Sequence, residues 1–143
     1  MMTNIQSESE QDTAKAAKDL AETIKEPKII LLNGNLGMGK TVFARSFIQT
    51  LCKAPALEVL SPTFTLLQTY ESDIAPIYHY DLYRIEDPEE IIELGWEDAC
   101  YEAITIIEWP ERLGPYKPTS YLDITLSNSD NSNTIREILI QQV

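Results

Sequence analysis

The chain has 143 residues, a length that predicts one domain over residues 1–143 rather than a catalytic domain beside a separate substrate domain. It carries 23 acidic and 11 basic residues, which give a formal net charge of −12. This charge argues against broad non-specific binding to nucleic-acid phosphates. No stretch is long enough to span a membrane, and the N-terminal "MMTNIQSESEQD" lacks the basic flank and apolar core of a secretion signal, so a cytoplasmic protein is expected.

The first predicted element is a helix over "SESEQDTAKAAKDLAETI". Ser7 and Glu10 have the spacing of a capping box, in which a serine and a later glutamate satisfy backbone N–H groups at the helix start. Small and apolar residues then recur at helical intervals, which predicts an amphipathic helix with a small-residue face. These residues are Ala14, Ala17, Ala21 and Ile24.

A buried strand is predicted over residues 28–33, because "KIILLN" has four consecutive apolar residues between a proline and a glycine. The following "GNLGMGKT", from Gly34 to Thr41, fits the phosphate-loop spacing G-x-x-x-x-G-K-[ST], and "TVFARSFIQTLC" predicts a helix after it. Glycines there let backbone N–H groups face inward, and the helix presents its positive end to an anion. We therefore expect a phosphate-binding loop rather than an ordinary glycine-rich turn. Its nucleotide-binding residues are Gly34, Asn35, Leu36, Gly37, Met38, Gly39, Lys40, Thr41 and Val42.

Two side chains of this loop have chemistry of their own. Lys40 would reach the β- and γ-phosphates of a nucleotide, and we expect its ammonium to be solvated when no phosphate is bound. The hydroxyl of Thr41 would supply one oxygen ligand to Mg²⁺. A nucleoside triphosphate with Mg²⁺ is therefore the expected ligand.

Two antiparallel strands are predicted from "SPTFTLLQTYE" and "PIYHYDLYR", which flank the short polar "SDIA". Asp81 could hold the water shell of Mg²⁺, or it could pair with His79 or Arg84 on the strand surface. His79 itself is interpreted as a packed or hydrogen-bonded strand residue without a catalytic role. Thr63 in "SPTF" stands where nucleotide-switching proteins place a threonine that senses the γ-phosphate, although a turn before a strand explains the motif equally well.

A helix is predicted over "DPEEIIELGWEDA", with Asp87 at its cap, Pro88 at the first position and Glu90 three residues after the cap. The strand "AITIIE" that follows ends in Glu108, where phosphoryl chemistry needs an acidic residue near the metal. A solvent-facing acid at a strand end is the alternative. Trp109 would pack against the nucleotide, against a partner or in the core.

The C-terminal part predicts two more strands, "YLDITL" and "TIREILIQQV", joined by the turn-rich "SNSDNSN". Strands alternate with helices early in the chain and form hairpins later. This order predicts an α/β fold, a P-loop NTPase-like three-layer domain with a mixed β-sheet flanked by helices.

Four of these motifs occur in an order that resembles the TsaE family, also called YjeE. They are "LNGNLGMGKT", "SPTF", "YHYDLYR" and "IIEWPERL", and the likeness runs over nearly the whole chain. The members of that family are the small P-loop ATPases of bacterial tRNA threonylcarbamoyladenosine modification. The resemblance implies an accessory subunit that binds ATP and Mg²⁺, hydrolyses ATP slowly and resets the TsaD–TsaB transferase between turnovers. The protein would contact tRNA only through these partners, and a monomer is favoured.

The resemblance also implies roles for single residues. Thr13 resembles a position near the adenine pocket, and Trp109 matches the tryptophan that follows the family's site glutamate. Asn35 and Met38 stand where the family commonly has Asp and Ala, at variable positions of the loop. The catalytic positions correspond to Lys40, Thr63 and Glu108, and the metal positions to Thr41, Asp81 and Glu108.

Two other functions remain open from the residues alone. A small-molecule kinase shares the loop but normally closes an arginine-bearing lid, for which a chain with 11 basic residues has little material. In a nucleotide-controlled binding module, ATP would order the "SPTF" segment and hydrolysis would be incidental. Glu108→Ala separates the module from a resetting ATPase, because only the ATPase would stall after the first round.

Overall fold

The computed structural model describes residues 2–129 and 134–143. Its elements, with η for a 3₁₀ helix, are β1 (Met2–Ser7), α1 (Glu10–Ala21), β2 (Lys28–Asn33), α2 (Lys40–Leu51), β3 (Leu67–Tyr70), β4 (Ile77–Asp81), η1 (Pro88–Leu94), α3 (Trp96–Glu102), β5 (Ile104–Glu108), η2 (Pro110–Tyr116), β6 (Leu122–Asn128) and β7 (Arg136–Gln142). Most predicted elements are present near their predicted positions. The turn predicted from "SNSDNSN" lies in part outside the described residues.

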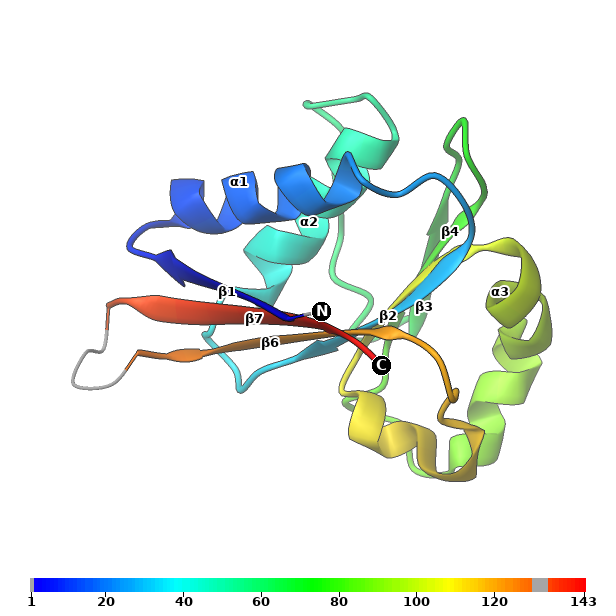
Figure 1. Cartoon of the computed structure of the whole chain (residues 1–143). Helices are drawn as coiled ribbons and strands as arrows, with labels where there is room; N and C mark the ends of the chain where they lie inside the picture. Colours follow the sequence, from blue (N-terminus) through cyan, green and yellow to red (C-terminus); the bar gives the residue numbers. More distant parts are fainter. Residues whose placement is uncertain (1, 130–133) are drawn as a thin grey trace.

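The described strands join one mixed sheet in the order β1-β7-β6-β2-β5-β4-β3 (Figure 1). The central strands β6, β2, β5 and β4 run parallel, whereas β3, β7 and β1 pair antiparallel with their neighbours. The carboxyl ends of β2, β5 and β4 therefore meet at one edge of the sheet. In open α/β sheets, ligands bind at this edge.

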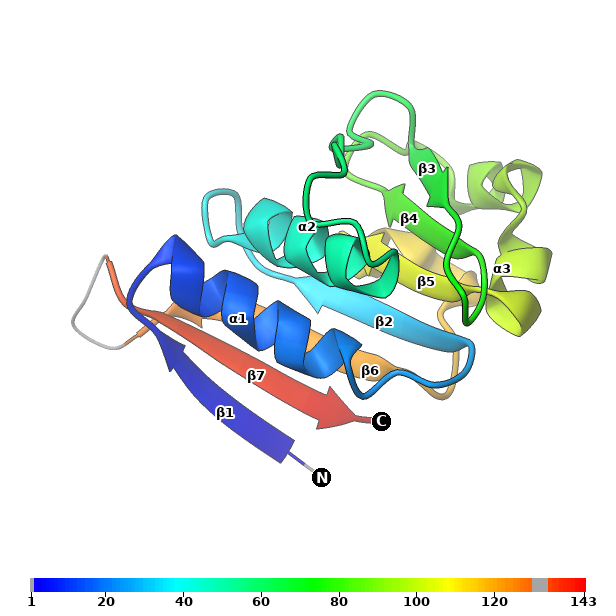
Figure 2. The ribbon, with the colours of Figure 1, turned by 90° about the horizontal axis from the view of Figure 1, so that it is seen from above.

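Helices cover both faces of the sheet, which confirms the predicted three-layer α/β architecture (Figure 1 and Figure 2). α1 and α2 lie on one face, where the rings of Phe43 and Phe47 stack at 6.4 Å in a first apolar core. η1, α3 and η2 surround a second core, in which Tyr80 and Trp96 meet edge to face at 5.6 Å. No helix in the described parts of the chain is long and apolar enough to cross a membrane.

The structure corrects the start of the chain. The edge strand β1 pairs antiparallel with β7, and α1 begins only after it. The helix cap is Ser9, whose Oγ accepts a hydrogen bond from the N–H of Asp12 at 3.1 Å. The predicted capping box of Ser7 and Glu10 was therefore wrong, because Ser7 ends β1 and its hydroxyl contacts Thr13 and the carbonyl of Ser9. "MTNIQS" is mostly polar and exposed, so only its pairing with β7 defines it as a strand.

Two further elements differ from their predicted extents. β3 starts at Leu67, well inside the predicted run, because Leu66 has a φ of 68° and its N–H donates to the carbonyl of Pro62. The "SPTF" segment is thus a turn before the strand, which fits either interpretation of Thr63. After the predicted cap at Asp87 the chain forms the 3₁₀ helix η1, and it becomes α-helical only beyond Gly95, whose φ is 75°.

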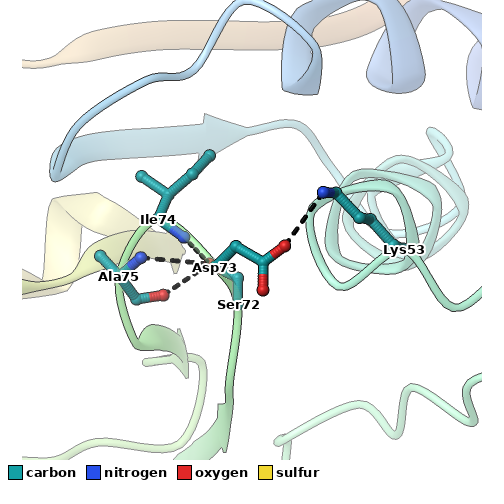
Figure 3. A network of polar contacts seen from close by, with 5 residues as sticks. All are labelled: Lys53, Ser72, Asp73, Ile74 and Ala75. Atoms are coloured by element: carbon teal, nitrogen blue, oxygen red, sulfur yellow. Dashed lines mark hydrogen bonds and ion pairs between the residues drawn. The ribbon is translucent and has the colours of Figure 1, made fainter.

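A single serine closes the turn between β3 and β4 (Figure 3). The hydroxyl of Ser72 donates to the carbonyl of Ala75 at 2.6 Å and accepts from the N–H groups of Ile74 and Ala75. Just beyond α2, Lys53 forms an exposed ion pair with Asp73 at 2.9 Å. Because exposed pairs contribute little to stability, the local hydrogen bonds of Ser72 are the main contacts that hold this turn.

Candidate functional site

The glycine-rich loop joins the central strand β2 to α2. β2 ends at Asn33 and α2 begins at Lys40, so Lys40 and Thr41 both lie in the first turn of the helix, as predicted. Gly37 and Gly39 have φ angles of 83° and 100°, which residues with a side chain rarely adopt. The first N–H groups of a helix have no acceptor within it. The loop and the helix start therefore offer backbone donors to an anion.

Gly34 has no room for a side chain. Its φ is 150°, and a Cβ would lie 2.7 Å from the backbone oxygen of Leu126 on β6. We expect Gly34→Ala to lower the free energy of unfolding by about 2 to 5 kcal/mol, because backbone strain and overpacking add. Gly37→Ala is the matched control, since nothing lies within 4 Å of its Cβ and only strain remains. Thermal unfolding measures both variants, and equal losses would contradict the steric explanation.

The predicted catalytic and metal-binding residues converge on a cavity of about 280 Å³ at the carboxyl edge of the sheet. The loop, the "SPTF" segment, β4 and β5 all contribute to its wall. Its lining residues are Glu10, Leu36, Gly37, Gly39, Lys40, Thr41, Val42, Ser61, Thr63, Asp81, Glu108 and Trp109. Every predicted catalytic and metal-site residue is among them, while Glu10 and Ser61 were not predicted.

Lys40 is buried rather than solvated, which corrects the expectation from sequence. Only 6 % of the residue is exposed, and its Nζ has no hydrogen-bond partner among the residues that the structure describes. The ammonium lies 3.9 Å from the ring centroid of Trp109, a cation–π contact. Burial lowers the pKa of Lys40, and the charges of Glu108 and Asp81 offset part of this effect. A buried ammonium without a hydrogen-bond partner suits an anionic ligand.

Asp81 is buried, and hydrogen bonds anchor both of its carboxylate oxygens. Oδ2 accepts from the hydroxyl of Thr63 at 3.1 Å, and Oδ1 accepts from the N–H of Tyr83 at 2.9 Å. Arg84, an alternative partner of Asp81, instead lies over the ring of Phe64 at 4.5 Å. The structure therefore brings Thr63 to the end of β4 and holds Asp81 in one orientation.

Glu108 lies opposite Asp81, because β4 and β5 are parallel and pair these residues in register. It is 5 % exposed, so the alternative of a solvent-facing acid was wrong. Its Oε2 lies 2.7 Å from Nε2 of His79. His79 is thus packed and hydrogen-bonded, as predicted, but its partner was not foreseen. The sequence feature that could have indicated this contact is the alternation of side chains along β4, which places His79 and Asp81 on the same side of the strand.

Trp109 follows β5 with a φ of 58° and packs at 4.9 Å against the ring of Tyr83. Together with Lys40, it also lines a neighbouring cavity of about 490 Å³. Asn35 and Met38, at the variable positions of the loop, line this second cavity. Trp109 thus contacts the loop lysine and also packs against the second apolar core.

Thr13 lies on α1, outside the wall of the 280 Å³ cavity. It is buried and shares a hydrogen bond of 2.7 Å with the hydroxyl of Ser7. These two residues line a third cavity of about 170 Å³, which reaches Gly37 of the loop and Val42 of α2. Thr13 is therefore beside the loop but apart from the carboxylates.

Few metal-binding side chains gather at the site. In residues 2–129 and 134–143, no group of three or more His, Cys, Asp or Glu side chains could hold a metal ion. Mg²⁺ does not need one, because it usually keeps several waters and binds one or two carboxylates together with phosphate oxygens. Asp81, Glu108 and the hydroxyl of Thr41 line the same cavity and offer such donors. The residues present fit Mg²⁺ as part of a nucleotide complex.

Known proteins are similar to this chain in sequence. The family model described as threonylcarbamoyl adenosine biosynthesis protein TsaE matches residues 7–138. The chain belongs to the TsaE family. The tRNA threonylcarbamoyladenosine biosynthesis protein TsaE of Rickettsia conorii is 44% identical over 131 residues, which cover 92% of this chain and 74% of that protein. The protein of the same name from Nostoc sp. is 38% identical over 144 residues, with 96% and 85% covered.

A solved structure shares the fold of this TsaE-family chain. The crystal structure of YdiB from Bacillus subtilis matches with a TM-score of 0.79 at 24% identity, over all of this chain and 86% of that one. The family match confirms the resemblance inferred from the four motifs.

Proposed function

We propose that this TsaE-family protein is a Mg²⁺-dependent ATPase, one P-loop domain over residues 1–143 that hydrolyses ATP slowly. Its task would be to reset the TsaD–TsaB transferase between turnovers of tRNA modification. The names of its relatives from Rickettsia conorii and Nostoc, tRNA threonylcarbamoyladenosine biosynthesis protein, support this. The observation that carries the proposal is a single cavity lined by Lys40, Thr41, Asp81 and Glu108.

The ATP phosphates would lie against the loop of residues 34–41, where backbone N–H groups would bind them. Lys40 would reach the β- and γ-phosphates. Its buried Nζ supports this, because phosphate oxygens would supply the hydrogen bonds that no described residue gives it. Phosphoryl transfer asks little covalent chemistry of a protein, so positioning and charge stabilisation would carry the rate.

Mg²⁺ would be held by Thr41, Asp81 and Glu108 together with the phosphates. Bound there, it would neutralise charge that develops on the β- and γ-phosphates. Glu108 would complete the shell of this ion or orient the attacking water. The two hydrogen bonds that Asp81 accepts support a role in holding Mg²⁺, because they already orient its carboxylate.

Thr63 would couple the nucleotide state to the partner proteins, because its hydroxyl links the "SPTF" loop to Asp81. We expect Thr63→Val to lower TsaD–TsaB-stimulated phosphate release by about tenfold, with ATP affinity within about threefold of the parent. Thr65→Val is the control, since Thr65 lies in the same loop but accepts from Gln68 instead. Unchanged basal and stimulated release in Thr63→Val would remove this threonine from the site.

The adenine would lie toward α1. Thr13 lines the cavity of about 170 Å³ that includes Gly37, Gly39 and Val42, which supports a base pocket next to the loop. Trp109 would pack near the phosphates, at the opposite end of the nucleotide.

The partner-binding surface is proposed beside the site. Leu36, Phe64 and Tyr83 are exposed apolar residues in segments that line the cavity, and Phe64 is 82% exposed. Exposed apolar groups that gather beside a site mark protein interaction surfaces. With a net charge of −12, the chain would contact tRNA only through TsaD and TsaB. On its own it would be a cytoplasmic monomer.

Repeated turnover of tRNA modification tests this function. TsaD and TsaB would be supplied with excess tRNA and threonylcarbamoyl donor, with and without this chain and ATP. We expect the pair alone to stop after the first round and the added chain to sustain the reaction. A chain that leaves the number of rounds unchanged would overturn the proposal.

The alternative function of a small-molecule kinase gains no support, because no arginine is among the described residues that line the 280 Å³ cavity.

A further inference from the structure

The chain has a single histidine, His79, which is buried against Glu108. β4 and β5 run parallel, with His79 paired to Ile106 and Asp81 paired to Glu108. His79 therefore lies beside Ile106, two residues before Glu108 along β5 and further from the carboxyl edge of the sheet. From there its Nε2 lies 2.7 Å from Oε2 of the carboxylate. The histidine thus supports, from inside the sheet, a carboxylate that lines the cavity.

The proposed role of Glu108 fixes the donor of this hydrogen bond. An ionised carboxylate can only accept, so a Glu108 that acts on the metal shell or the attacking water requires Nε2 of His79 to donate. The other ring nitrogen, Nδ1, is buried and has no hydrogen-bond partner within the described part of the chain. A buried unpaired polar group opposes folding, and an apolar residue at this position would avoid that cost. Unlike an apolar residue, a histidine at this position can form a hydrogen bond with Glu108.

We propose that His79 is a positioning residue, which fixes the rotamer of Glu108 and leaves the second carboxylate oxygen for the cavity. This rests on the proposed ATPase function, in which Glu108 acts on the metal shell or the attacking water. Asp81 is held in a comparable way by Thr63 and Tyr83, so each carboxylate of the site has its own anchor. Without the Nε2–H donor, Glu108 would rotate more freely and lose a hydrogen bond in a buried place.

Two substitutions, His79→Gln and His79→Asn, separate a positioning role of His79 from a packing role, because their amide side chains differ in length. The Nε2 of glutamine is as many bonds from Cα as the Nε2 of histidine, so His79→Gln retains a donor for Glu108. The amide nitrogen of asparagine matches only the Nδ1 position, so His79→Asn keeps the polarity but loses this donor. Tyr80→Phe is the control on the same strand, because it removes a partly buried hydrogen bond of 2.7 Å to the carbonyl of Leu94, in the core around α3 and η1.

We expect His79→Asn to lower the kcat of ATP hydrolysis by about 10- to 100-fold, with ATP affinity by calorimetry within about threefold of the parent. His79→Gln should recover most of the rate. Tyr80→Phe should lower the melting temperature and leave kcat unchanged. Parent-like kcat in His79→Asn, equal losses in both amides, or an equal loss in Tyr80→Phe would each overturn the inference.

Nuclear magnetic resonance reads the same contact without nucleotide or metal. Because the chain has a single histidine, its isotope-labelled imidazole gives one set of signals. We expect a slowly exchanging Nε2–H signal in the parent and in Tyr80→Phe, and its loss in Glu108→Ala. A parent without this protected signal would overturn the inference.

The two proposals fail in distinguishable ways. A parent chain that releases no phosphate from ATP, alone or with TsaD and TsaB, overturns the proposed function and this inference with it. A parent that hydrolyses ATP, with His79→Asn equally fast, overturns this inference alone.

Discussion

Lys40→Met is expected to abolish ATP binding and, at the same time, to stabilise the ligand-free fold. The ammonium of Lys40 is buried and has no hydrogen-bond partner in the described ranges of the chain. A charge in such a place opposes folding, and methionine keeps the apolar length of the side chain without the charge. We expect a gain of about 1 kcal/mol in the free energy of unfolding, roughly 2–4 °C in melting temperature for a chain of this size.

This gain should depend on pH. Because burial lowers the pKa of Lys40 below its ordinary 10.5, the unfolded chain binds more protons than the folded chain between the two pKa values. The stability of the parent therefore rises with pH through this window. The advantage of Lys40→Met is complete below the window and shrinks as the pH approaches 10.5.

Thermal unfolding of both proteins from neutral to alkaline pH measures the stability difference, and calorimetric titration measures ATP binding. Tight ATP binding by Lys40→Met would contradict the assignment of the loop. A lower melting temperature of Lys40→Met at neutral pH would contradict the destabilising effect of the buried charge.

Glu108→Gln is expected to stop ATP turnover and to leave ATP binding nearly intact. Glutamine keeps the shape of the side chain and an oxygen that accepts from His79, but it lacks the negative charge and the basicity of the carboxylate. Phosphate release should fall by about 10²- to 10⁴-fold, the range that a general base contributes. Glu111→Gln is the control, because Glu111 is an exposed acid nearby that lines the neighbouring cavity.

The same variant separates a resetting ATPase from a nucleotide-controlled binding module. With TsaD, TsaB and tRNA, a chain carrying Glu108→Gln should support the first round and then stall. Sustained modification by this variant, with its hydrolysis lost, would contradict resetting and favour the module.

Much of the site could be predicted because its parts are specified locally. The spacing of Gly34, Gly39 and Lys40 lies within one loop, and the strand that ends in Glu108 is one apolar run. β2, α2 and β5 were therefore predicted close to their observed ends. The order of strands and helices was sufficient for the three-layer class, because parallel strands joined by helices must be covered on both faces.

The parts that could not be predicted depend on contacts between distant segments. β1 is a strand because β7 offers it an edge, which its own polar sequence does not indicate. Lys40 contacts Trp109 from a distant part of the chain, and His79 meets Glu108 only through the register of β4 with β5. Periodicity in a single sequence gives no such register.

The most direct test is the release of phosphate from ATP by the purified chain, measured with and without the TsaD–TsaB pair. We predict slow release by the chain alone, faster release with the pair, and loss of both in Glu108→Gln. No stimulation by the pair, with fast turnover only when a small hydroxylated metabolite is added, would contradict the resetting ATPase and favour a small-molecule kinase.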